Sequence, residues 1–249
     1  MAHLQQDPCV SSAGYRLGEA GAEHRALLAE QMLGIVSHDL RNPLLAIRMA
    51  AGILARRAQE PRTTQLLAQI IQSTQRAERL AADLQDFCQV RGGRGLAILP
   101  VPGDFQQAVA SCLDELRLSF ANVTLRHVRL GEGRVAFDHD RLCQLIGNLV
   151  GNAVAYGHPG APVTVTAHIG VASASVSVHN LGMPITHAHI SELFEPMVRG
   201  YSQNVALRSV GLGLFIVRQI ARAHHGEVTV HSSWRAGTTF SVVFPRNCS

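Results

Sequence analysis

Hydrophobic residues in the first third of the chain recur at the three- and four-residue spacing of an amphipathic helix. From about Glu23 the pattern includes Leu28, Met32, Ile35, Val36, Leu44, Leu45, Ile47, Ala51 and Leu54. Pro43 lies inside this run, and a proline within a helix removes one backbone hydrogen bond and bends the helix. The pattern therefore predicts a first long helix with a bend near residue 43, and residues 61–64 predict a short connection after it.

A second amphipathic run follows with a heptad repeat. Its apolar and small positions are Leu66, Ile70, Ser73, Ala77, Leu80, Leu84 and Phe87. Two long helices joined by a short loop predict an antiparallel hairpin. A hairpin cannot bury so wide an apolar stripe by itself, so we expect two copies to form a four-helix bundle, which makes the protein a homodimer.

The pattern changes after the glycine-rich residues 91–95, which we interpret as a linker. Alternation of period two predicts strands over residues 96–101, 123–129, 134–137, 163–169, 173–179, 227–232 and 238–244. Helices are predicted over residues 104–117, 138–156 and 211–225, and a loop with one helical turn near residues 188–194 over 180–208. This order predicts an α+β fold, in which a helical hairpin precedes an α/β sandwich with helices on one face of a mixed sheet.

Composition limits the classes of function. The chain has 249 residues, 47% of them hydrophobic, and a net charge of +4 carried by scattered arginines, so nucleic acid is not an expected partner. The five dispersed cysteines show no paired spacing, which favours reduced thiols and a cytoplasmic location. No apolar run approaches 18 residues, so we expect no membrane span.

The predicted domains follow from these changes in pattern. Residues 1–20 are expected to be a tail or the stub of an upstream region, residues 21–91 the dimerising hairpin, and residues 96–246 the α/β domain.

Residues 37–44 of the first helix combine groups that can carry a phosphoryl transfer. His38 is followed directly by Asp39, and a carboxylate beside a neutral imidazole can orient it and accept its proton. Asn42 lies one turn later on the same face. These residues make His38 a candidate phosphate acceptor.

The predicted helix from Asp138 carries amides at four-residue spacing, Gln144, Asn148 and Asn152, beside an apolar stripe of Leu142, Leu145, Ile146, Leu149 and Ala153. Asparagine is unfavourable inside a helix, so these positions need a reason. Two reasons remain open from the residues alone. The amides could tie down a neighbouring loop, or their oxygens could hold a Mg²⁺ ion that carries phosphates.

Glycine-rich segments follow at residues 178–185 and 211–214, with residues 193–200 between them. Glycines let backbone N–H groups approach a ligand, and a helix amino terminus favours phosphate. Arg199, Arg208 and Gly211 frame a loop that we interpret as a phosphate lid.

Together, these five segments resemble a two-component sensor histidine kinase, whose catalytic domain belongs to the ATPase superfamily shared with gyrase. Residues 37–44 resemble its phospho-acceptor box and residues 140–156 its asparagine box. Residues 178–185, 193–199 and 211–226 resemble the first glycine box, the phenylalanine box and the second glycine box. All five occur in the order and at the spacing of the family, over roughly residues 24–246.

The resemblance implies an ATP-dependent histidine autokinase. His38 would take the γ-phosphate of ATP, Asp39 would act as the general base, and Asn42 would position water for dephosphorylating a partner. The phosphoryl group would then pass to an aspartate of a response-regulator receiver domain, docked near Leu45 and Ala46. Asn152 would coordinate Mg²⁺. The expected nucleotide-binding residues are Asn148, Asn152, Tyr156, Asn180, Gly182, Ile185, Arg199, Gly211, Leu212, Gly213 and Leu214.

Four positions depart from the family pattern. Asn180 stands where an aspartate usually accepts a hydrogen bond from adenine, and a neutral acceptor is weaker than a charged one. Ala155, Met197 and Ser209 replace a usual lysine, phenylalanine and glycine. These departures leave open a degenerate histidine phosphotransfer or scaffold dimer that does not use ATP. A gyrase-like ATPase does not account for His38 on a dimerising hairpin.

Four further histidines and the tryptophan are expected to be structural or at the surface: His187, His189, His224, His225 and Trp234.

Overall fold

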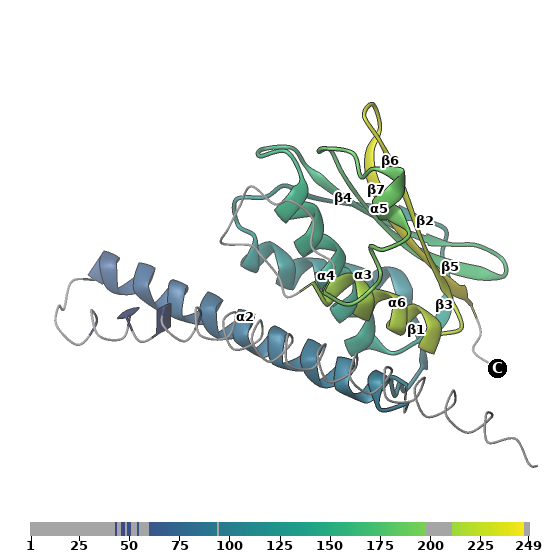
Figure 1. The fold of residues 1–249 in the computed structure, drawn as a ribbon, viewed down its shortest axis with the longest axis horizontal. Coiled ribbons are helices and arrows are strands. Elements are labelled where there is room, and N and C mark those ends of the chain that lie inside the picture. Colours follow the sequence, from purple (N-terminus) through teal and green to yellow (C-terminus); the bar gives the residue numbers. More distant parts are fainter. Residues whose placement is uncertain are drawn as a thin grey trace, which may run out of the picture.

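The computed structural model describes residues 60–93, 95–197 and 211–246, and within the preceding helix the isolated positions 43, 46, 47, 49, 50 and 54 (Figure 1). His38, Asp39 and Asn42 lie outside the described residues, as do Leu45 and the lid positions Arg199, Arg208 and Ser209. Pro43 is helical, as predicted for a proline inside the first helix, and it is buried.

The second helix of the predicted hairpin is α2, Glu60–Arg91, which is 32 residues long and extends well beyond the sheet and its covering helices in Figure 1. The predicted seam is confirmed, because Leu80 and Phe87 are buried and the other seam positions are half-buried. The predicted connection at residues 61–64 is wrong, since these residues form the first turn of α2. A proline is tolerated there because the first N–H groups of a helix have no partner within it.

The rest of the chain forms a mixed α/β unit. Its helices are α3 (Phe105–Ser119), α4 (His139–Tyr156), α5 (His187–Ile190) and α6 (Gly213–Ala223). Its strands are β1 (Val101–Asp104), β2 (Leu125–Leu130), β3 (Arg134–Phe137), β4 (Val163–Ile169), β5 (Ser173–Asn180), β6 (Glu227–Ser233) and β7 (Gly237–Pro245).

The main sheet has the order β2-β4-β5-β7-β6, in which β2 pairs with β4 in parallel and the other pairs are antiparallel. Alternate residues of β5 are buried, namely Ala174, Val176, Val178 and Asn180. These side chains face α3, α4 and α6, which cover one side of the sheet in Figure 1. The predicted α+β class and the mixed sheet with helices on one face are confirmed.

One predicted strand is wrong. Residues 96–100 have no regular structure, and the strand instead begins at Val101 and pairs with β3. Pro102 and Gly103 lie within it, and these residue types disfavour strands in sequence-based prediction.

The end of α2 packs on the α/β unit. The rings of Phe87 and Phe215, on α6, have centroids 5.5 Å apart, and Leu80 and Phe87 belong to the same hydrophobic core as the sheet. Helix α2 is therefore joined to the helices that carry the predicted nucleotide-binding residues.

The expectation of reduced thiols is wrong for two cysteines, because Cys112 on α3 and Cys143 on α4 form a disulfide. Their separation of 31 residues gave no sign of pairing, and only the packing of α3 on α4 brings them together. Cys88 on α2 is a free, exposed cysteine.

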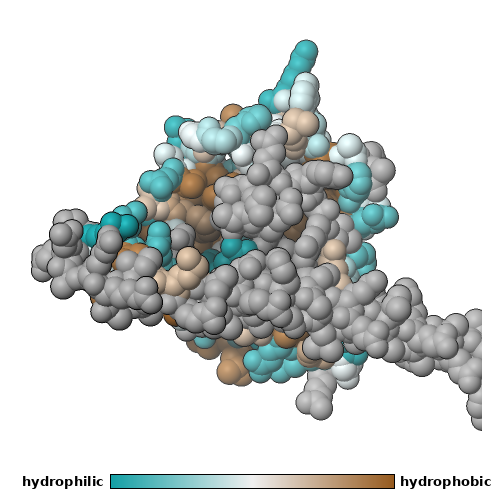
Figure 2. All heavy atoms as spheres, turned by 60° about the vertical axis from the view of Figure 1, so that its left-hand side comes forward, coloured by the Kyte–Doolittle hydropathy of each residue, from teal (hydrophilic) through white to brown (hydrophobic). Residues whose placement is uncertain are grey.

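Hydrophobic atoms lie on the surface in separate patches between hydrophilic ones in the view of Figure 2. The exposed large side chains include Trp234, which is 74% exposed as predicted, Leu99 and Val171. Among the helices of the described segments, none combines the length and the apolar character that crossing a membrane requires.

Candidate nucleotide-binding site

The amino end of α4 is fixed by Asp138, the residue at which the sequence predicted this helix to begin. The Asp138 carboxylate accepts hydrogen bonds from the backbone N–H of Arg141 at 3.1 Å and of Leu99 at 2.8 Å. The backbone N–H of Asp138 itself donates to His224 Nε2 at 3.1 Å. Helix α4 thus starts at a defined place relative to the end of α6.

His224 is 4% exposed and makes a hydrogen bond through each ring nitrogen. Its Nδ1 lies 2.9 Å from the carbonyl oxygen of Ile220, so Nδ1 carries the proton and Nε2 accepts from Asp138. Only the neutral ring satisfies both partners. The structure therefore gives His224 the structural role expected for it.

The amide face of α4 meets α2. Gln144 Nε2 donates to Asp83 at 3.2 Å and to Asp86 at 2.8 Å, both on α2. Gln144 therefore ties down a neighbour, which was one of the two interpretations, although the neighbour is a helix and not a loop. Asn148, one turn further, has a buried Nδ2 that makes no hydrogen bond of good geometry among the described residues, although the amide lies near enough to the Asp83 carboxyl to lower the pKa of that group.

The side chain of Asn148 lies against the amino end of α6. A Cβ added at Gly213 would be 3.4 Å from Asn148 Oδ1. The N-cap position of α6, Leu212, has no side chain able to accept hydrogen bonds from the first turn, and Gly211 before it has a φ of 81°. Unpaired N–H groups at a helix start favour a phosphate, and the Asn148 amide lies beside them.

The carboxyl end of α4 meets the end of β5. Gly157 and Gly182 form an isolated bridge, and the N–H of His158 donates to Leu181 O at 2.7 Å. A Cβ at Gly182 would lie only 2.5 Å from the carbonyl oxygen of Tyr156, so this close approach requires glycine.

Asn180, the last residue of β5, lies at this junction. It is 5% exposed, and its Nδ2 donates to the carbonyl of Leu181 at 3.4 Å. The same nitrogen would be 3.2 Å from a Cβ at Gly182. The sequence-predicted Tyr156, Asn180 and Gly182 are therefore brought together, and Asn152 lies on α4 one turn before Tyr156.

Ile185 is held by the sheet. Its N–H donates to Ser232 Oγ at 2.9 Å, and Ser232 Oγ lies 2.7 Å from Thr238 Oγ1. The side chain of Ile185 packs on the hydrophobic core. The glycine-containing turn after β5 is thus fixed between α4 on one side and β6 on the other.

The two ends of the predicted lid lie next to each other. The N–H of Met197 donates to the carbonyl of Gly211 at 3.0 Å, and Met197 has a φ of 65°. Nearby, Arg218 of α6 forms an ion pair of 3.0 Å with Glu195. Arg199, which we predicted to bind phosphate, follows Met197 in the sequence but lies outside the described residues.

The chemistry of these groups fits a nucleotide carried by a hard cation. Asn148 and Asn152 offer amide oxygens, which suit Mg²⁺, and the first turn of α6 offers N–H donors for phosphate. The buried Asn180 and the turn at Gly182 offer polar groups to a base. These roles are predictions from position and chemistry.

Sequence reasoning missed the acidic residues of α2 that border this site. Asp86 forms an ion pair of 2.7 Å with Arg141 of α4. Burial raises the pKa of Asp83 to about 6. The amides of Gln144 and Asn148 oppose this shift, while the neighbouring Asp86 charge adds to it. Asp83 and Asp86 are three residues apart on one helix face, but nothing in the sequence identifies the partners.

Two protein-family models match the chain. Residues 28–93 match the His Kinase A (phospho-acceptor) domain. Residues 137–247 match the histidine kinase-, DNA gyrase B- and HSP90-like ATPase, which implies that this domain binds ATP. The two matches contain all the residues predicted to take part in catalysis or nucleotide binding.

Related proteins agree with these matches. A bacteriophytochrome of Pseudomonas aeruginosa is 34% identical over 204 residues, which cover 82% of this chain and 28% of the relative. The histidine protein kinase DivJ of Caulobacter vibrioides is 32% identical over 240 residues, covering 93% of this chain and 40% of the relative. This chain thus spans less than half the length of either relative.

Among solved structures, histidine kinase ThkA in complex with response regulator protein TrrA superposes with a TM-score of 0.59 at 22% identity. The match covers 97% of this chain and 68% of that one, and it supports the fold.

Proposed function

Because the chain belongs to the two-component sensor histidine kinases, we propose that it is an ATP-dependent histidine autokinase with His38 as the phosphate acceptor. The observation that carries the proposal is the meeting of three elements. The amide face of α4 meets the end of β5 at one end and the uncapped start of α6 further along, and this meeting supports a nucleotide site between them.

The described residues divide into two groups in this mechanism. Asn180, Gly182, Ile185 and Tyr156 would hold the base at the junction of β5 and α4. The N–H groups of residues 211–214 and the Asn148 amide would hold the phosphates, while Asn152 would hold Mg²⁺. The bound cation would neutralise phosphate charge, and positioning with charge neutralisation is most of what phosphoryl transfer needs from a protein.

The acceptor side of the reaction uses residues 38–42. Asp39 orients the His38 imidazole and accepts its proton as the ring nitrogen attacks the γ-phosphorus and ADP leaves. The phosphoryl group of His38 then passes to an aspartate carboxylate of a response-regulator receiver domain. Ala46, which is exposed, would lie in the docking surface, and Asn42 would orient water during removal of phosphate from the partner.

The helical hairpin supplies the second partner, which is another copy of the chain. We place the dimerisation and phospho-acceptor domain at residues 21–91 and the catalytic domain at residues 96–246, preceded by residues 1–20 as a tail or stub of an upstream region. The half-buried seam positions of α2 in a single chain, such as Ile70 and Ala77, are available to complete a four-helix bundle. A cytoplasmic location remains part of the proposal, although the Cys112–Cys143 disulfide removes one of its arguments.

The deciding experiment is transfer of label from γ-labelled ATP to the full chain. We expect label that is stable in alkali and lost in acid, as for phosphohistidine, and that is absent in His38→Gln. His38→Gln should keep the nucleotide affinity of the wild type, because residue 38 lies in a different domain from the pocket. Label that survives in His38→Gln would refute the assignment of the acceptor.

Nucleotide binding separates the kinase from a phosphotransfer or scaffold dimer. Calorimetry with ATP and Mg²⁺ should detect binding by the full chain. A chain that binds no ATP but accepts phosphate on His38 from a phosphorylated receiver domain would be a phosphotransfer protein.

A further inference from the structure

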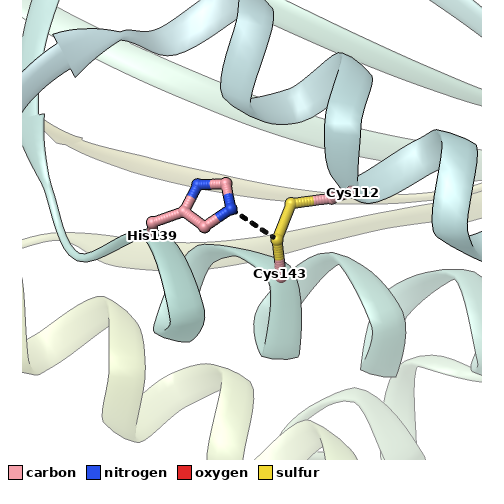
Figure 3. Close-up of side chains that lie close together, drawn as sticks. All are labelled: Cys112, His139 and Cys143. Carbon is pink, nitrogen blue, oxygen red and sulfur yellow. Dashed lines mark hydrogen bonds between the residues drawn. A yellow bond between two sulfur atoms is a disulfide. The ribbon is translucent and has the colours of Figure 1, made fainter.

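Three side chains of metal-binding types lie close together between α3 and α4 (Figure 3). Cys112 comes from α3, while His139 and Cys143 are four residues apart on α4 and share one face of that helix. Their ligand atoms lie within 4.8 Å of one another. None of the three takes part in the proposed kinase reaction.

The separations suit a tetrahedral ion bound by nitrogen and sulfur. With Zn–S of about 2.3 Å and Zn–N of about 2.0 Å, a sulfur and a nitrogen ligand lie about 3.5 Å apart, and two sulfurs about 3.8 Å apart. The distance from His139 Nε2 to Cys143 Sγ is 3.7 Å. Figure 3 shows the imidazole directed at the Cys143 sulfur with no backbone between them. The two sulfurs are bonded here, so they must first separate.

Burial leaves an approach to the group from one side. Cys112 is 2% exposed, Cys143 is half-buried and His139 is exposed. An ion entering past His139 would meet the two sulfurs beneath it and keep water in the fourth position. The buried sulfur would hold the ion firmly, while the exposed ligand lets it enter and leave.

We propose that Cys112, Cys143 and His139 form a redox-gated site for a thiophilic divalent ion of the Zn²⁺ class, and that the disulfide is its oxidised, metal-free form. Opening the site takes two electrons and two protons from a dithiol reductant, which itself becomes a disulfide, and leaves two cysteine thiols. Zn²⁺ then displaces the two thiol protons and binds both thiolates and His139 Nε2.

The site is continuous with the proposed nucleotide pocket through α4. Cys143 precedes Asn148 by five residues on the same helix, and Cys112 fixes that helix to α3. A change between the disulfide, dithiol and metal-bound forms therefore acts on α4, the helix that carries Asn148 and Asn152. The binding test below does not depend on kinase activity, so its result stands whether or not the chain is a kinase.

The test uses the full chain and Co²⁺ as a probe, because Co²⁺ bound to thiolates gives a near-ultraviolet charge-transfer band and visible bands typical of tetrahedral geometry. After reduction under argon, we expect these bands to saturate at one Co²⁺ per chain and to disappear when Zn²⁺ is added. The oxidised chain should show none. Absence of the bands in the reduced chain, or their presence in the oxidised chain, would overturn the proposal.

Variants assign the ligands. Cys143→Ser and Cys112→Ser should lose the charge-transfer band, and His139→Gln should weaken Co²⁺ binding by more than about tenfold. Cys88→Ser is the matched control, because Cys88 is exposed on α2. This variant should bind Co²⁺ as the wild type does. A Cys143→Ser variant that keeps the band would place the metal elsewhere.

Alkylation of the wild-type chain gives a second measurement that needs no variant. In the reduced chain, Zn²⁺ should slow alkylation of Cys112 and Cys143 but leave that of Cys88 unchanged. Equal alkylation rates of Cys143 with and without Zn²⁺ would contradict the proposal.

Discussion

Arg141 on α4 forms an ion pair with Asp86 on α2, with Nη1 and Oδ2 2.7 Å apart and the Asp86 side chain 7% exposed. Gln144 donates to the same carboxylate oxygen at 2.8 Å. The pair therefore joins the helix of the phospho-acceptor hairpin to the helix that carries the predicted Mg²⁺ ligand.

Breaking this ion pair should be costly, because a buried carboxylate would lose its cationic partner. We predict that Arg141→Gln lowers the free energy of unfolding by about 3 kcal/mol, measured by urea denaturation. Arg117→Gln is the control, since its pair with Asp114 is exposed and should contribute less than about 1 kcal/mol. Equal effects of the two substitutions would show that burial of the Asp86 pair contributes nothing.

Asp83 should make stability depend on pH. Folding raises its pKa from 3.8 to about 6, so the folded chain binds more protons than the unfolded chain between these values. Stability from this group is therefore fully present below about pH 4 and is lost as pH rises through about 6.

The variant Asp83→Asn removes the titrating group but keeps an oxygen that can accept from Gln144. We expect it to flatten the pH dependence of the urea midpoint between about pH 4 and 7 and to raise that midpoint at pH 8. Asp114→Asn, at an exposed position of α3, should leave the profile unchanged. A wild-type midpoint that rises steadily from pH 4 to 7, together with an identical profile in Asp83→Asn, would contradict the raised pKa.

Gly182 should be required for the nucleotide site. In Gly182→Ala the new methyl group would meet the Tyr156 carbonyl at 2.5 Å, so the end of β5 must move away from α4. We predict at least about a tenfold loss of affinity for a fluorescent ATP analogue, corresponding to about 1.4 kcal/mol.

Gly151→Ala is the matched control, because no atom lies within 4 Å of a Cβ at this helical position. It should keep the affinity and stabilise α4 by up to about 1 kcal/mol. Unchanged affinity in Gly182→Ala would show that nucleotide binding does not depend on the junction of β5 and α4.

Asn152 should act through the metal. We predict that Asn152→Ala reduces the gain in ATP affinity that Mg²⁺ gives, while affinity measured in chelator stays near that of the wild type. Calorimetry with and without Mg²⁺ measures the difference. Asn122→Ala, in an exposed loop, is the control. If Asn152→Ala weakens ATP affinity equally with and without Mg²⁺, Asn152 contacts the nucleotide or supports the fold and does not hold the ion.

The sequence by itself predicted most of the elements and the family. The limits of α4 follow from a cap at Asp138 and a stripe of apolar residues, both of which are local signals, and β3 and β4 follow from alternation. The order of the amides, the glycines and His38 along the chain indicated the family, because that order is itself a property of the sequence. The strand at β1 was misplaced because its pairing with β3 depends on a distant segment.

The tertiary structure decided which side chains meet across elements. Asp86 with Arg141, and Cys112 with Cys143 and His139, are pairings between helices whose relative placement local periodicity does not contain. A heptad or an alternating pattern states which face of an element is buried, but not which residue of another element it will contact. For that reason the hydrogen-bonded acids of α2 and the cysteine–histidine group emerged only when the helices were packed together.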